Sequence, residues 1–322
     1  MDQIIRHLKN SSRILVVTHT SPDGDAIGSL TAMGIALSML GKKTTLYNES
    51  LIPAVYRFLP SVNLVVRQIG SESYDTAVAL DCSDLQRIGK AVSALNQIPV
   101  VINIDHHITN TGFGNFQLID TSACASAEIV YRLIKQMDVA INKDIATSIY
   151  TGILTDTGSF RFSNTNKAAF AICEEMVALG VDPYTIAQQV YGTYSLGRIK
   201  LLNLALDSIE ISYNGKLSIM TLTQDMFNET RTQPEDVDGL INYAKSIEDI
   251  KIAALIQEHH NSEGNSRPFS KYHVSLRSDG TVDVAEIAFA FGGGGHSSAA
   301  GFNIESNLWD LKSKLFSLSE KI

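Results

Sequence analysis

Residues 14–29 read ILVVTHTSPDGDAIGS, and this stretch decides how the chain folds. Its first four residues form an apolar, strand-like run that stops at Thr18. A turn follows that holds one imidazole and two carboxylates, from His19, Asp23 and Asp25. Residues 26–40 contain no proline and repeat apolar residues at helical spacing. The stretch therefore joins a buried strand to a helix, and in an open α/β sheet such a junction is where ligands bind.

This turn allows two interpretations. One nitrogen donor and two oxygen donors so close together suit a hard or borderline divalent cation such as manganese, magnesium or zinc. Alternatively, Pro22-Asp23-Gly24 is ordinary turn chemistry, and Asp25 is the N-cap of the helix. The stretch by itself does not choose between these two interpretations.

The first 190 residues alternate between strand and helix signals. Strand-like runs occupy residues 43–47, 76–80 and 100–104, and helical patterns occupy residues 2–10, 125–136, 144–155 and 168–179. Because the strands are separated by helices, the sequence predicts an α/β fold with a doubly wound, mostly parallel sheet.

Polar side chains also follow the later strands. Asp81 ends the strand at 76–80, although an aspartate there could simply cap a helix, for which Asp84 is the better candidate. Asp105, His106 and His107 follow the strand at 100–104. Two imidazoles and a carboxylate just past a buried strand would cost burial energy without partners. The strand ends therefore place further candidate ligands beside the first turn.

A last carboxylate lies at the end of the helical pattern 144–155. Asp156 stands in a turn rich in threonine and glycine. It is either another ligand or an aspartate that stabilises the turn by bonding its own backbone.

The pattern changes after a short polar break at residues 191–195. We place a first domain at residues 1–190, a helical linker at 191–207 and a second, smaller α/β domain at 208–322. The second domain opens with a hairpin around Asn214-Gly215, and strands follow at 250–257 and 272–276. His259-His260 lies among polar residues, and we interpret this pair as part of a solvated loop and not as a metal site.

Four consecutive glycines, residues 292–295, precede His296 and follow an apolar helical run at 284–291. Bare backbone amides at Gly293, Gly294 and Gly295 can approach a ligand closely. We expect the next helix to aim its N-terminus at the same point, which would complete an anion cradle. The alternative is a plain hinge. The run is not a P-loop, because no Gly-Lys-Ser/Thr follows it.

Composition limits the function classes. The net charge is −8 and the pI is near 5.5, so no global basic field is available to hold long nucleic acid. Cys82, Cys124 and Cys173 are odd in number and widely spaced, which favours reduced thiols over disulfides or a thiolate metal site. No apolar run is long enough to cross a bilayer, and the first residues lack the layout of a signal peptide. We expect a cytoplasmic protein with a small anionic substrate.

These motifs, taken in order along the chain, resemble the DHH phosphoesterase superfamily with its glycine-rich C-terminal domain. The resemblance spans nearly the whole chain. It rests on the following residues: His19, Asp23, Asp25, Asp81, Asp105, His106, His107, Asp156 and the run from Gly292 to His296. Within the superfamily the chain is most similar to the bacterial oligoribonucleases, or nanoRNases, that also dephosphorylate 3'-phosphoadenosine 5'-phosphate.

The resemblance implies two divalent cations, typically Mn²⁺, with Mg²⁺ or Co²⁺ as possible substitutes. His19 and Asp23 would hold one cation, and Asp25, His106 and Asp156 the other. Asp81 would bridge both cations, and Asp105 would orient a histidine. His107 and Asp81 are the two expected catalytic residues. His107 would contact the scissile phosphate or help to protonate the leaving oxygen. Arg277, Gly293, Gly294, Gly295 and His296 would hold the far phosphate or nucleotide across a cleft between the domains.

The resemblance also predicts the reaction. Two cations that share a water would generate a hydroxide aimed at phosphorus, and short oligoribonucleotides would yield mononucleotides, with 3'-phosphoadenosine 5'-phosphate yielding AMP. We expect no long nucleic acid and no membrane among the partners, and a homodimer is compatible with the fold.

Three alternatives stay open. A cyclic or linear dinucleotide phosphodiesterase uses the same chemistry. Pyrophosphatases and polyphosphatases of this fold carry clustered basic residues in the second domain, whereas Arg267, Lys271 and Arg277 are spread out here. A nucleotide-binding regulator without turnover is the third alternative, and it would leave nucleotide unchanged in the presence of manganese.

Overall fold

The computed structural model describes residues 1–192, 194–259 and 270–320. The chain forms two compact units, Met1–Thr193 and Tyr194–Ile322. Two residues considered above, His260 and Arg267, lie outside the described residues. No helix in the described ranges combines the length and the apolar character that crossing a bilayer requires.

The first unit is built on a six-stranded sheet in which every strand pair is parallel. Its strands are β1 (Arg13–Thr18), β2 (Lys43–Tyr47), β3 (Val65–Val66), β4 (Thr76–Leu80), β5 (Val100–Asp105) and β6 (Phe116–Ile119). Their order across the sheet is β3-β2-β1-β4-β5-β6. The predicted parallel sheet is confirmed, although the edge strand β6 was not predicted.

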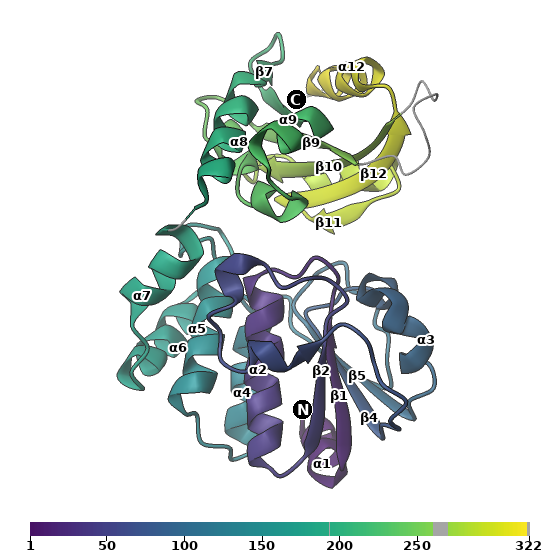
Figure 1. Ribbon diagram of the computed structural model, residues 1–322, viewed down its shortest axis with the longest axis vertical. Coiled ribbons are helices and arrows are strands. Elements are labelled where there is room, and N and C mark those ends of the chain that lie inside the picture. The colour runs from purple at the N-terminus through teal and green to yellow at the C-terminus, as the bar shows by residue number, and fades with distance from the viewer. Residues whose placement is uncertain (193, 260–269, 321–322) are drawn as a thin grey trace. The chain divides into compact units, whose positions relative to one another are not determined.

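Helices cover both faces of this sheet (Figure 1). The helical segments of the first unit are α1 (Asp2–Asn10), α2 (Gly24–Met39), η1 (Ala54–Tyr56), η2 (Val62–Leu64), η3 (Leu85–Ala91), α3 (Val92–Leu95), α4 (Ser126–Gln136), α5 (Lys143–Asp156), α6 (Lys167–Ala178), α7 (Pro183–Ala187) and η4 (Gln188–Gly192).

Alternation along the strands explains the two layers of helices. Ile14 and Val16 of β1 belong to the core formed with α2, α4 and α5. Leu15 and Val17 point to the opposite face and belong to a second core that includes residues of η3 and α3. Because successive side chains of a strand alternate between faces, a continuous apolar strand needs cover on both sides. This requirement makes the sheet doubly wound.

The strand order places the site. β1 lies in the middle of the sheet. From β1 the chain first builds β2 and β3 on one side, and then returns to build β4, β5 and β6 on the other side. The loops that leave the carboxyl ends of β1 and β4 therefore diverge, and such a switch point is where open α/β sheets bind ligands. The polar residues after β1, β4 and β5 all lie at this edge of the sheet.

Close packing between α2 and α5 holds the two helices that carry Asp25 and Asp156. A Cβ added to Gly28 would lie 2.5 Å from the backbone oxygen of Ser148, and one added to Gly152 would lie 3.0 Å from Oδ1 of Asp25. These positions admit no side chain without movement of a helix. The contact therefore fixes the separation of α2 and α5 near the site.

The second unit contains a mixed six-stranded sheet in the order β11-β12-β10-β9-β8-β7. Its strands are β7 (Glu210–Ile211), β8 (Leu217–Leu222), β9 (Ile252–His259), β10 (Ser270–Ser278), β11 (Gly294–His296) and β12 (Ala299–Ser306). The pair β8 and β9 is parallel and the other pairs are antiparallel. The predicted hairpin is present as β7 and β8.

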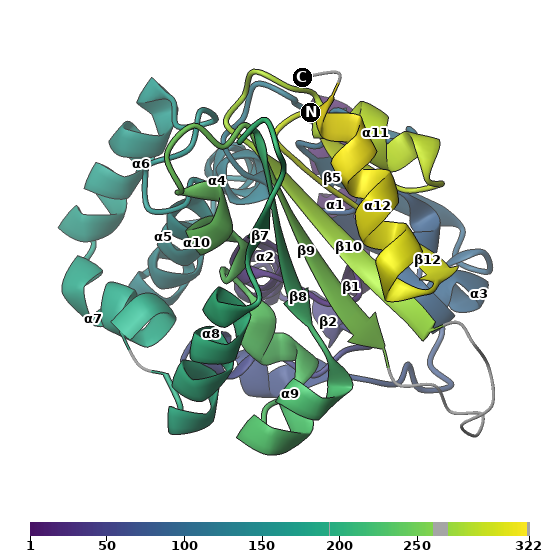
Figure 2. The same cartoon turned by 90° about the horizontal axis from the view of Figure 1, so that it is seen from above.

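Helices lie on both faces of this second sheet (Figure 2). They are α8 (Leu196–Asp207), α9 (Gln224–Thr230), η5 (Pro234–Val237), α10 (Ile241–Lys245), α11 (Val284–Ala290) and α12 (Leu308–Ser319). Residues of α11 and α12 pack on one face, and residues of α8, α9 and α10 pack on the other. The helix at 196–207 thus contributes Leu201 and Ala205 to the core of the second unit.

The expectation of a helix directly after the glycine run is wrong. Residues 294–296 form β11, which pairs with β12, and the next helix, α12, starts only at Leu308. Gly292 ends α11 with a positive φ of 79°, and a Cβ on Gly293 would lie 2.1 Å from the backbone oxygen of Gly301. Two of the glycines therefore serve a helix end and a close strand contact. No helix N-terminus completes an anion cradle here.

Candidate metal centre

The turn after β1 supplies two candidate ligands. His19 is buried, and its Nδ1 lies 2.8 Å from the backbone oxygen of Thr20. A carbonyl oxygen only accepts, so Nδ1 donates and Nε2 is left as the acceptor nitrogen. Asp23 is the N-cap of α2, because its Oδ1 accepts from the backbone N–H of Ala26 at 3.0 Å. The proposal that Asp25 caps this helix is therefore wrong.

Asp25 lies in the first turn of α2, is 1% exposed, and accepts three hydrogen bonds. Its Oδ2 accepts from the backbone N–H of Ser126 at 2.6 Å, and its Oδ1 accepts from the backbone N–H of Ala127 at 2.8 Å. The hydroxyl of Ser29 donates to the same Oδ1 at 3.1 Å. Two first-turn amides of α4 thus orient this carboxylate.

Asp81 follows β4 with a φ of 53°, in the left-handed region that a residue with a Cβ rarely adopts. Such backbone strain persists only where the surroundings enforce it, and it is common at functional sites. Oδ2 of Asp81 lies 3.5 Å from Nε2 of His19, and Oδ1 lies 3.8 Å from Nε2 of His106. The hydroxyl of Ser126 donates to Oδ1 at 3.0 Å. The two oxygens of one carboxylate therefore face two different imidazoles.

His106 has a defined orientation at the carboxyl end of β5. Its Nδ1 donates to the backbone oxygen of Ala123 at 3.3 Å. Its Nε2 lies 3.6 Å from Oδ2 of Asp156 and 4.0 Å from Oδ2 of Asp25. The nitrogen that faces the carboxylates is thus the one that the backbone contact leaves for coordination.

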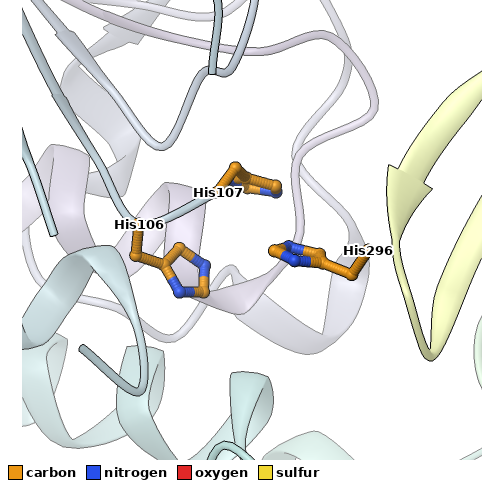
Figure 3. Close-up of side chains that lie close together, drawn as sticks. All are labelled: His106, His107 and His296. Atoms are coloured by element: carbon orange, nitrogen blue, oxygen red, sulfur yellow. The ribbon is translucent and has the colours of Figure 1, made fainter. Parts of the chain in front are cut away.

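His107 points to a different partner. Its Nδ1 donates to Oδ1 of Asp105 at 2.7 Å, and Asn110 donates to Oδ2 of Asp105 at 2.6 Å. The ring centroids of His106 and His107 are 4.9 Å apart, at an interplanar angle of 67°. Figure 3 shows the two side chains. Asp105, which is fully buried, therefore orients His107 and not His106.

Two groups of donors emerge from these contacts. His19, Asp23 and Asp81 form one, and Asp25, His106 and Asp156 form the other; in each group one atom per residue lies within 4.8 Å of the others. Asp81 approaches both groups through separate oxygens, as the distances above show. Imidazole nitrogens and carboxylate oxygens, with their orienting hydrogen bonds already made, fit a pair of divalent cations.

The electrostatics of the groups also favour cations. Burial, together with the Asp81 and Asp156 carboxylates, raises the pKa of Asp25 well above its usual range. Burial raises the pKa of Asp156 to about 7, an effect that His106 opposes and Asp23 reinforces. Burial would lower the pKa of His106, but the carboxylates around it raise that pKa to about 9. The carboxylates of Asp25 and Asp156 thus retain protons because their negative charges, crowded together in a buried site, repel one another. A bound divalent cation would relieve this repulsion.

The pKa of Asp81 shifts in the opposite direction from those of Asp25 and Asp156. Burial alone would raise its pKa, but the imidazoles of His19, His107 and His106 lower it below the usual range. Burial also works to lower the pKa of His107, which the hydrogen bond to Asp105 raises instead. The centre therefore contains an ionised carboxylate flanked by histidines.

Two of the candidate residues of the second unit lie in one row of its sheet. Arg277 of β10 and His296 of β11 are both paired with Ala299 of β12. Residues directly opposite each other on neighbouring strands project to the same face, so the two side chains share a face of the sheet. A Cβ added to Gly294 would meet no other atom of the described residues within 4 Å. Within the second unit, a guanidinium and an imidazole are therefore presented on one side.

Sequence reasoning did not identify Ser126, Asn110 and Asn164 as residues of the site. Each donates a hydrogen bond to a carboxylate of the centre: Ser126 to Asp81, Asn110 to Asp105 and Asn164 to Asp156. Ser126 at a helix start and Asn110 three residues after a histidine pair are ordinary polar positions. Ser126 and Asp81 are 45 residues apart, so no local pattern reveals their contact. Asn110 and Asn164 lie five and eight residues from their partners, but asparagines in turns are too common for such a spacing to single them out.

Comparison with known proteins gives a consistent result. Residues 13–153 match the family described as "DHH family, N-terminal domain", and residues 214–321 match the "DHHA1 domain". A bifunctional oligoribonuclease and PAP phosphatase of Thermus thermophilus is 33% identical over 303 residues, which are 91% of this chain and 84% of that protein. A protein of the same description from Bacillus subtilis is 26% identical, over 96% of this chain and 94% of that protein.

The fold is also similar to a solved structure. A crystal structure of an exopolyphosphatase-related protein from Bacteroides fragilis aligns with a TM-score of 0.88 at 25% identity. The alignment covers 99% of this chain and 95% of that one. The likeness thus extends over both units.

Proposed function

Because this chain belongs to the DHH family and is a hydrolase of phosphoester bonds, we propose that its substrates are short oligoribonucleotides and 3'-phosphoadenosine 5'-phosphate. The products would be mononucleotides and AMP. The observation that carries the proposal is the pair of donor groups joined by Asp81, in a chain that is 33% identical to an oligoribonuclease and PAP phosphatase.

We assign the donor groups to two divalent cations. His19 and Asp23 would hold one cation, Asp25, His106 and Asp156 the other, and Asp81 would contribute one oxygen to each. Mn²⁺ is the expected ion, because carboxylate ligands suit it and a probable manganese-dependent inorganic pyrophosphatase of Streptococcus thermophilus is 26% identical over 247 residues. When bound, such cations lower the pKa of a water and polarise the phosphoryl group.

His107 would act on the substrate. The hydrogen bond from its Nδ1 to Asp105 leaves Nε2 as the nitrogen that can approach a phosphate oxygen. The raised pKa favours the cationic form of the ring, which would stabilise the additional charge of the transition state and supply a proton for the leaving oxygen. Asp105 contributes by holding the ring in this orientation.

Arg277 and His296 would bind the far end of the substrate. A guanidinium binds phosphate oxygens with two parallel hydrogen bonds, and an imidazole on the same sheet face supplies another donor. The residue between them, Ala299, carries only a methyl group. We assign Gly293, Gly294 and Gly295 to the same substrate contact through their backbone amides.

The test is Mn²⁺-dependent hydrolysis of a panel: a five-nucleotide RNA, a dinucleotide, 3'-phosphoadenosine 5'-phosphate and pyrophosphate. Asp81→Ala and His107→Ala serve as controls. Release of mononucleotides from the RNA, lost in Asp81→Ala, would support the proposal. Cleavage of pyrophosphate alone would move the chain to the polyphosphate substrates suggested by the name of the Bacteroides fragilis protein. Nucleotides recovered intact would indicate a binding protein.

A further inference from the structure

Asn164 makes an unusual set of contacts in the segment that follows α5. Its Nδ2 lies 3.0 Å from Oδ2 of Asp156, 3.1 Å from the backbone oxygen of Asp156 and 2.8 Å from the backbone oxygen of Cys124. Its Oδ1 is buried and has no hydrogen-bond partner among the described residues. The amide therefore acts only as a donor.

Two other asparagines show the role that asparagine commonly has, from which the role of Asn164 differs. Asn142 accepts from the backbone N–H of Ile145 at 2.9 Å and caps α5, and Asn166 accepts from the backbone N–H of Ala169 at 2.8 Å and caps α6. Both use Oδ1 to begin a helix, which is the common structural role of asparagine. Asn164 begins no helix, and its Oδ1 has no hydrogen-bond partner in the part of the chain that the structure describes. A capping role does not explain why an amide is buried here at the cost of an unpaired oxygen.

The contacts of Asn164 join two parts of the centre. Cys124 lies two residues before Ser126, whose backbone N–H donates to Asp25 and whose hydroxyl donates to Asp81. Asn164 therefore ties the Asp156 carboxylate to the segment that orients two other carboxylates. Oδ2 of Asp156, the oxygen that Asn164 contacts, is also the oxygen 3.6 Å from Nε2 of His106.

We propose that Asn164 is a positioning residue of the reaction, which holds Oδ2 of Asp156 beside His106 so that both can bind one cation. The inference rests on the proposed function, because it assigns Asp156 and His106 to a cation. Partners that orient metal ligands typically change cation affinity or activity by about 10- to 100-fold when they are removed.

The experiment measures Mn²⁺ binding to the full chain by calorimetry, with thermal unfolding of the cation-free protein as a separate readout. Asn164→Ala should weaken one of two Mn²⁺ sites by about 10- to 100-fold. Asn164→Leu, which is close to asparagine in shape and lacks the donor, should do the same and replaces the alanine variant if that does not fold. Asn142→Ala, at the other end of α5, should lower the unfolding temperature and leave Mn²⁺ affinity unchanged.

A double-mutant cycle separates positioning from general destabilisation. In an Asp156→Asn background, removing the Asn164 side chain should weaken Mn²⁺ binding little further, because the carboxylate it orients is already absent. Equal losses in both backgrounds, or wild-type Mn²⁺ affinity in Asn164→Ala, would overturn the inference while the proposed function stands. A wild-type chain that binds no Mn²⁺ would overturn the proposed cation chemistry and this inference with it.

Discussion

Replacing Gly28 by alanine tests whether the contact between α2 and α5 sets the geometry of the centre. The new Cβ would lie 2.5 Å from the backbone oxygen of Ser148, whereas Cβ contacts under 3.0 Å are essentially never found. The helices must therefore separate by at least about 0.5 Å, because the obstacle is backbone and cannot rotate away. Asp25 lies one turn before Gly28 on α2, and Asp156 ends α5.

The expected change in the free energy of unfolding combines two opposing effects. Overpacking a core contact costs about 1–3 kcal/mol, and the better helix propensity of alanine returns about 1 kcal/mol, so the net destabilisation is about 0–2 kcal/mol. Function should suffer more. A misplacement of about 1 Å in an active site can cost roughly 100-fold in rate, so a shift of about half that size should lower kcat/KM about tenfold.

The assay is kcat/KM on a short RNA together with Mn²⁺ affinity and thermal unfolding. Gly34→Ala on the same helix is the matched control, because its Cβ would meet only side-chain atoms of Leu46, at 2.6–3.2 Å, and not the backbone of α5. The control should keep wild-type activity and Mn²⁺ affinity. Wild-type activity in Gly28→Ala, or an equal loss in Gly34→Ala, would refute the reasoning that this backbone contact sets the site.

Three further predictions address the chemistry of the site. Mn²⁺ affinity measured by calorimetry should fall from pH 8 to pH 6, because the ion must displace protons that the raised pKa values of His106, about 9, and Asp156, about 7, retain in this range. An affinity that does not change between these pH values would contradict this. Ser126→Ala removes a donor to Asp81, and steady-state kinetics should show about a tenfold lower kcat/KM, since hydrogen bonds to charged groups contribute about 1.5–3 kcal/mol. Arg277→Ala should raise KM while calorimetry shows unchanged Mn²⁺ binding, and loss of both would mean that Arg277 supports the metal centre.

The sequence by itself determined the parallel sheet and placed the candidate ligands at one edge of it. Apolar runs that end in polar residues, such as Val100–Asp105 followed by His106, predict buried strands whose carboxyl ends bear ligands. All strands of a parallel sheet present these ends at one edge, so a local pattern was enough to bring distant residues together. Asp84 was also correctly identified as a cap, because its carboxylate accepts from the backbone N–H of Gln86, only two residues further on.

Other features were decided only by the tertiary structure. Asp23, and not Asp25, caps α2, since the carboxylate of Asp25 is taken by backbone amides of α4, about a hundred residues away in the chain. The glycine run is followed by strands, because Gly293 packs against the backbone of β12 and glycine spacing does not reveal what lies opposite.

The same limit applies to Asn164. Its contact with Asp156 depends on how the segment after α5 returns toward the start of α4, and neither residue's local sequence records that path. Periodicity and turn chemistry act between residues a few positions apart, so they place elements and their ends. Hydrogen bonds between distant ends, such as those from Ser126 to Asp25 and Asp81, depend on three-dimensional packing, which local patterns do not record.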